Sequence, residues 1–146
     1  MSLIVKEADE TVNNSVAVQN DDELLFAVAA NEVWQFEGLL VVSSNAAADF
    51  RLTFVGPTGA VGAWGATAYN SGLATTQSGS GGDLAGEGTH AITGTTDGAY
   101  TVFRFWGGIH NGANAGNLTL QWAQGTVNAS DTIVHAGSYL KYQIES

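Results

Sequence analysis

The sequence of 146 residues contains no cysteine, one proline and only four basic residues. The absence of cysteine excludes disulfides, thiolate metal ligands and cysteine nucleophiles. The four cations Lys6, Arg51, Arg104 and Lys141 stand against 14 acidic residues, which gives a formal net charge of −10. Nucleic acids and anionic membranes both require clustered cations, so we expect neither of them as a partner.

Long apolar runs are also missing, and no segment reaches the length needed to span a bilayer. The segment from Met1 to Glu10 carries one lysine and three carboxylates and lacks the apolar centre of a signal peptide. We therefore expect a protein that is made and used without export.

What the sequence does contain is glycine, at 19 positions, and hydrophobic residues, at 45% of the chain. Val, Thr, Phe, Trp and Tyr alternate with polar residues over short stretches, a pattern typical of β-strands joined by glycine turns. The length suits one domain. We predict an all-β, single-domain antiparallel β-sandwich of jelly-roll type with about eight strands.

The eight predicted strands share this alternation and lie at 23–30, 33–43, 49–55, 60–69, 89–95, 99–106, 117–123 and 138–144. Within the second, Gly38 permits a bend or bulge. Residues 70–88 are rich in Gly, Ser and Thr, which predicts a long flexible loop. Residues 1–14 are interpreted as an N-terminal arm preceding a domain at 15–146. In that arm Leu3, Ile4 and Val5 either add a strand to a neighbouring subunit or belong to a tail or a first strand of the same domain.

Candidate catalytic and metal-binding groups do not form a recognisable motif. His90, His110 and His135 lack ligand spacing and are expected to be isolated surface or turn residues. The acidic stretch from Asn20 to Glu23 lacks calcium-loop spacing, so a solvated turn is favoured, and Asp9 and Glu10 are expected to be solvated as well. We expect no enzymatic activity, no catalytic residues, no metal and no cofactor.

Most aromatic residues fall on the alternating face of predicted strands and are expected in the core. These are Trp34, Phe36, Phe50, Phe54, Phe103, Phe105 and Trp122. Trp64, Tyr69 and Trp106 instead flank glycine-rich turns. They are candidates for a subunit interface or for a platform that stacks on carbohydrate.

Several segments, in order along the chain, resemble the small β-sandwich structural proteins of tailed-phage virions. The matching segments are Asn13-Asn14-Ser15, Asn20-Asp21-Asp22-Glu23-Leu24, Phe26-Ala27-Val28, Ala30-Asn31, Trp34-Gln35-Phe36-Glu37, Ala48-Asp49-Phe50, Phe54-Val55-Gly56-Pro57, the run 116–124 (GNLTLQWAQ) and Ala136-Gly137-Ser138-Tyr139-Leu140. The resemblance covers nearly the whole chain except residues 70–88.

This resemblance implies a capsid decoration (cement) protein that binds and stabilises the head lattice as a homotrimer. Its partners would be further copies of itself and the major capsid protein. Its location would be the outer surface of the capsid in the virion, after synthesis in the host cytoplasm. The alternative is a carbohydrate-binding or receptor-binding module of a tail or fibre. A third interpretation, an enzyme such as a fragment of a polysaccharide depolymerase, is disfavoured because no carboxylate pair or triad is evident.

Overall fold

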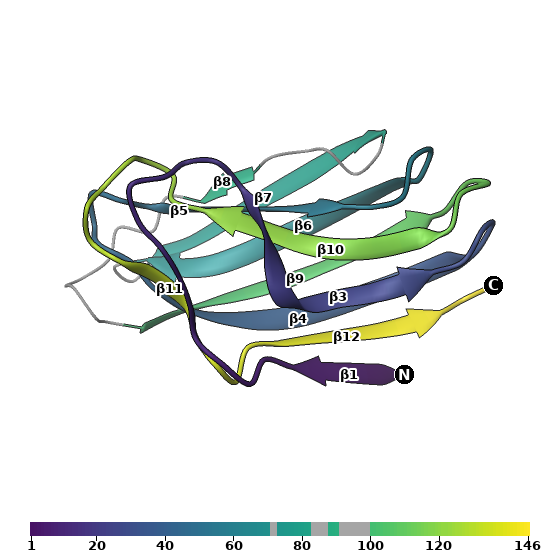
Figure 1. Cartoon of the computed structure of the whole chain (residues 1–146), viewed down its shortest axis with the longest axis horizontal. Helices are drawn as coiled ribbons and strands as arrows, with labels where there is room; N and C mark the ends of the chain where they lie inside the picture. Colours follow the sequence, from purple (N-terminus) through teal and green to yellow (C-terminus); the bar gives the residue numbers. More distant parts are fainter. Residues whose placement is uncertain (71–72, 83–87, 91–99) are drawn as a thin grey trace.

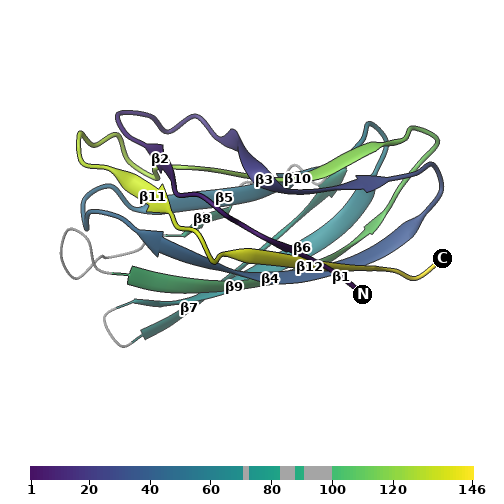
Figure 2. The ribbon, with the colours of Figure 1, turned by 60° about the horizontal axis from the view of Figure 1, so that its bottom comes forward.

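The chain forms a sandwich of two antiparallel sheets with no helix in the described residues (Figure 1), and burial alternates along strands such as Gln19–Val28 and Val33–Ser43. The computed structural model describes residues 1–70, 73–82, 88–90 and 100–146, with backbone alone for 69–70, 73–82 and 88–90. Figure 2 shows the two sheets as separate layers. The predicted all-β sandwich is confirmed.

The larger sheet has the order β1-β12-β4-β9-β6-β7, with β11 pairing both β4 and β2. Its strands are β1 (Ser2–Val5), β2 (Glu10–Val12), β4 (Val33–Ser43), β6 (Val61–Asn70), β7 (Leu73–Gly82), β9 (Tyr100–His110), β11 (Thr132–Val134) and β12 (Tyr139–Ile144). The smaller sheet has the order β3-β10-β5-β8. Its strands are β3 (Gln19–Val28), β5 (Phe50–Val55), β8 (Gly88–His90) and β10 (Gly116–Ala123). The chain crosses repeatedly from one sheet to the other, as in a jelly roll.

The core lies between the two layers and consists largely of aromatic rings. Phe54 of the smaller sheet lies 4.8 Å from Phe36 and 5.3 Å from Phe105 of the larger sheet, measured between ring centroids. Phe50 similarly contacts Phe103 at 5.1 Å. The aromatic residues predicted for the core are buried, apart from Trp34, which is half-buried at its edge.

Seven of the eight predicted strands have counterparts; of the strand predicted at 89–95, residues 89–90 belong to β8 and 91–95 lie outside the described residues. Two local predictions were wrong. Gly38 makes no bulge, because β4 and β9 pair without a register shift from Val33 to Ser43. A side chain at Gly38 would instead collide with the Phe105 ring and the Tyr139 carbonyl oxygen, so close packing explains this glycine. Leu73–Gly82, predicted as loop, pairs with β6 over its whole length.

The N-terminal segment belongs to the sandwich of its own chain. β1 pairs with β12 from Ser2↔Tyr142 to Val5↔Tyr139, and β2 pairs with β11. Of the alternatives for Leu3, Ile4 and Val5, the structure therefore shows a first strand of the same domain. Ile4 packs against the core, whereas Leu3 and Val5 point outwards.

Candidate interaction face

Several exposed apolar side chains lie on the larger sheet, on the side away from the core. Alternate residues of β1, β12, β4, β9 and β6 project there because successive side chains of a strand point to opposite faces. We call this surface the outer face and define it by Leu3, Val5, Glu37, Leu39, Val41, Val61, Val102, Arg104, Trp106, Tyr139 and Lys141.

The strand register aligns these residues in rows across the sheet. One row runs Val5, Tyr139, Leu39, Arg104 and Thr67, with each residue directly opposite the next. The neighbouring row is formed by Leu3, Lys141, Glu37, Trp106 and Gly65. Val5, Tyr139 and Leu39 form an apolar stretch across three strands. In the neighbouring row Lys141 and Glu37 separate Leu3 from Trp106. Exposed apolar patches mark interaction sites.

Trp106 is the largest exposed side chain of the outer face, with 44% of its surface accessible. Its register partner on β6 is Gly65, which has no side chain to cover the indole. Exposed tryptophans of this kind are common anchors of protein interfaces. The prediction of Trp106 as an interface or stacking residue is consistent with this placement.

The other two predicted aromatic candidates behave differently. Trp64 is 3% exposed and packs edge-on against Phe54 in the core, so its prediction as a surface residue was wrong. It shares the inward face of β6 with the buried Ala66 and Ala68. The side chain of Tyr69 lies outside the described residues.

The outer face also differs from the rest of the chain in charge. It holds Arg104 and Lys141, two of the four cations in the sequence, and one carboxylate, Glu37. The ammonium group of Lys141 lies over the Tyr139 ring, 5.5 Å from its centroid. The smaller sheet, by contrast, presents polar residues outwards, such as Asn117 and Gln121 on β10.

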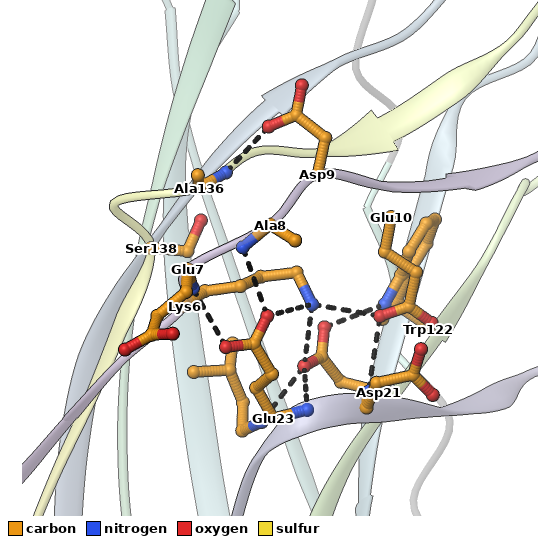
Figure 3. A network of polar contacts seen from close by, with 12 residues as sticks. Lys6, Glu7, Ala8, Asp9, Glu10, Asp21, Glu23, Trp122, Ala136 and Ser138 are labelled. Atoms are coloured by element: carbon orange, nitrogen blue, oxygen red, sulfur yellow. Dashed lines mark hydrogen bonds and ion pairs between the residues drawn. The ribbon is translucent and has the colours of Figure 1, made fainter.

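A second polar feature closes the edge of the sandwich where the segment between β1 and β2 passes β3 (Figure 3). Its centre is the buried ammonium group of Lys6, which lies 2.9 Å from Glu10 Oε2 and 3.0 Å from Asp21 Oδ1. A third carboxylate, Glu23, lies 3.8 Å away. We call this region the acidic edge and define it by Glu7, Asp9, Glu10, Asp21, Asp22 and Glu23.

Backbone and indole groups complete the network around Lys6. Asp21 accepts hydrogen bonds from the backbone N–H of Glu23 and Leu24 and from the indole N–H of Trp122. Glu23 accepts from the backbone N–H of Glu7 and Ala8. These contacts fasten the N-terminal segment to β3.

The pKa shifts reflect this burial. Burial by itself disfavours the charged form of Lys6, but hydrogen bonds and charge from Glu10 and Asp21 outweigh it and raise its pKa. Burial raises the pKa of Glu10 despite its bond to Lys6. The stretch Asn20–Glu23 was predicted to be a solvated turn, but its Asp21 is buried. Glu10 was predicted to be solvated, but it forms an ion pair with Lys6.

His135 was expected to be isolated but has partners on both ring nitrogens. Nε2 lies 2.8 Å from the Ser43 hydroxyl and Nδ1 lies 3.2 Å from Asp9 Oδ2. Asp9 also accepts a hydrogen bond from the backbone N–H of Ala136. This hydrogen bond lowers the pKa of the Asp9 carboxyl more than the contact with His135 does. The order of atoms matches a Ser-His-Asp triad, yet Ser43 is only 4% exposed and the Tyr100 ring packs edge-on against His135.

Within the described residues no group of three or more His, Asp or Glu side chains is arranged so that it could hold a metal ion. None of the described segments contains a helix long and apolar enough to cross a membrane. His110 is exposed on β9, and the side chain of His90 lies outside the described residues.

The acidic edge and the Ser43-His135-Asp9 line were missed by sequence reasoning. Their members come from segments far apart in the chain, such as Lys6 with Asp21 and Asp9 with His135. One available signal was the lone lysine of the N-terminal segment among several carboxylates. It did not indicate which of them would be buried.

The features above define a class: an all-β sandwich with an exposed aromatic face and a carboxylate-rich edge. No family model matches the chain, and no curated protein matches it. Among solved structures it is similar to "Structure of infectious bursal disease virus Gt strain", with a TM-score of 0.25 and 9% identity. This likeness covers 99% of this chain and 37% of that chain.

A second similar structure is "Structure of infectious bursal disease virus Gx strain", with a TM-score of 0.21 and 14% identity over 97% of this chain and 40% of that chain. The chain therefore spans less than half the length of either virus protein. Neither likeness bears on function at these TM-scores.

Proposed function

We propose that this protein is a structural component of a tailed-phage virion, and specifically a capsid decoration protein that acts as a homotrimer. Its partners are further copies of itself and the major capsid protein, and its place is the outer surface of the head. The observation that carries the proposal is the outer face, an apolar and aromatic surface that assembly would cover. The ordered motifs of the sequence supply the link to phage particles.

In this role the protein works by binding and not by catalysis. A ligand that binds the assembled lattice but not its free subunits stabilises the lattice by mass action. Many moderate contacts repeated by symmetry then add together. No cofactor, metal or catalytic residue is required for such a function.

The test is to mix the purified protein with phage heads that lack their decoration. We expect saturable co-sedimentation, density at symmetry-related positions of the lattice by cryo-electron microscopy, and a higher temperature of head disruption. Absence of binding would contradict the decoration role. Density at the tail tip of intact particles would contradict its placement on the head.

The second candidate is a carbohydrate-binding module of a tail or fibre, favoured by the exposed indole of Trp106. A flat aromatic ring offers a surface on which a sugar can stack. A glycan array with binding that is lost in Trp106→Ala, together with tail location, would support this candidate. An array without binding would count against it.

A further inference from the structure

We propose that the outer face of one copy binds the acidic edge of a second copy, so that three copies close a ring. This inference rests on the proposed function in assuming that the protein assembles with itself. It goes beyond the proposed function by naming the two different surfaces that form the contact between copies. Contacts of this head-to-tail type generate closed rings when the rotation between copies fits.

The two surfaces carry charge of opposite sign. The acidic edge holds six carboxylates against Lys6, which gives −5 of the chain's −10. The outer face holds Arg104 and Lys141 against Glu37, which gives +1. A face-to-face pair would bring the two cations of each copy together, whereas a head-to-tail contact places them against carboxylates.

The area of the outer face is close to that of a standard interface. Five strands spaced by about 4.8 Å and covered over a length of about 30 Å give roughly 700 Å² for the outer face. A stable interface of standard size buries about 800 Å² on each partner. The outer face is therefore large enough to serve as one half of a specific interface.

The two surfaces also differ in the residues that they expose. Trp106 lies within the outer face between Glu37 on β4 and Gly65 on β6, and aromatic and arginine residues at such positions carry much of the binding energy of interfaces. On the acidic edge, Glu7 and Asp22 are exposed. Their carboxylates lie beside the buried network rather than at its centre, so they are the carboxylates we assign to the second copy.

The experiment is light scattering on size-separated protein over a range of concentrations. We expect a trimer for the natural chain and at least about tenfold weaker assembly for Trp106→Ala. Asn117→Ala, on the outward side of the smaller sheet, is the matched control and should assemble as the natural chain does. A trimer that survives unchanged in Trp106→Ala, or a natural chain that is a dimer or a monomer, would overturn the inference.

Charge reversal tests the pairing itself. Arg104→Glu should weaken assembly, and adding Asp22→Arg should recover at least part of the loss by restoring opposite charges. Near-ultraviolet circular dichroism and thermal melting establish that each variant is folded before it is scored. Equal assembly of Arg104→Glu and the natural chain, or no recovery in the double variant, would contradict the pairing.

Binding to undecorated heads separates this inference from the proposed function. A trimer that depends on Trp106 and Arg104 but does not bind heads would support the interface and refute the decoration role. Binding of heads by a protein whose assembly is unaffected by both substitutions would do the reverse.

Discussion

Replacing Lys6 by methionine tests whether the N-terminal segment is an integral part of the fold. Methionine keeps most of the length of the side chain and removes the charge. In the natural chain the ammonium group is buried between Glu10 and Asp21, and Asp21 is fully buried. The substitution leaves these two carboxylates without their cation.

The size of the effect follows from burial. An exposed ion pair contributes roughly 0.2–1 kcal/mol, whereas removing one partner of a buried pair costs about 3–5 kcal/mol because the remaining charge is uncompensated. For a domain of this length, 1 kcal/mol lowers the melting temperature by about 2–4 °C. We therefore expect Lys6→Met to melt on the order of 10 °C below the natural chain.

The assay is urea unfolding followed by tryptophan fluorescence, because the indole of Trp122 donates to Asp21 within the same network. Lys141→Met is the matched control, since Lys141 lies half-buried on the outer face. All variants are compared at one low protein concentration, because assembly also stabilises. A loss of less than about 1 kcal/mol in Lys6→Met, where about 3–5 is expected, would refute the reasoning.

The raised pKa of Lys6 also predicts how its contribution to stability changes with pH. The pKa of Lys6 is raised in the folded state, so its contribution is complete below the ordinary lysine pKa. The contribution is lost as pH rises through the raised value. The difference between the natural chain and Lys6→Met should accordingly shrink in strongly alkaline solution, provided both remain folded.

Three further predictions concern other parts of the fold. Gly38→Ala should destabilise by about 3 kcal/mol in thermal or urea unfolding because the new methyl group meets backbone and a buried ring. Gly108→Ala should be tolerated, because its methyl group would make only an ordinary van der Waals contact with the Trp34 carbonyl oxygen. Asp49→Asn should stabilise slightly at neutral pH, since burial raises the pKa of Asp49 and so disfavours its ionised form; the gain should vanish as pH falls below the ordinary carboxyl pKa. Deleting residues 1–11 should lower the melting temperature at least as much as Lys6→Met does, because it also removes β1; an unchanged melting temperature would contradict the placement of this segment.

Strands were predictable wherever hydrophobic alternation extended over six or more residues. β4, with Phe36, Leu40 and Val42 buried, and β5, with Phe50, Leu52 and Phe54 buried, follow directly from that pattern. β2 and β11 are too short, at three residues each, to show it. β7 was missed because its Gly and Ser residues lack the pattern, although their backbone pairs with β6 as any other strand would.

The interaction surfaces were only partly predictable. Trp64 and Trp106 stand in similar glycine-rich surroundings in the sequence, yet one is buried and the other exposed. The difference lies in register, since Trp64 projects from β6 towards Phe54 and Trp106 projects from β9 to the other side of the same sheet. Such a distinction depends on which strands pair, and local sequence does not encode that pairing directly.

Ser43, His135 and Asp9 contact one another in the order of a hydrolase triad, which raises the question of whether Ser43 is reactive. A nucleophilic serine must be reached by its substrate, and Ser43 is almost fully buried on a regular strand beneath Tyr100 and His135. We expect no labelling of Ser43 by a fluorophosphonate at neutral pH, and lower stability in His135→Ala through loss of the contacts to Ser43 and Asp9. Stoichiometric labelling that disappears in His135→Ala would show instead that the serine is activated, and would overturn the proposal of a purely structural protein.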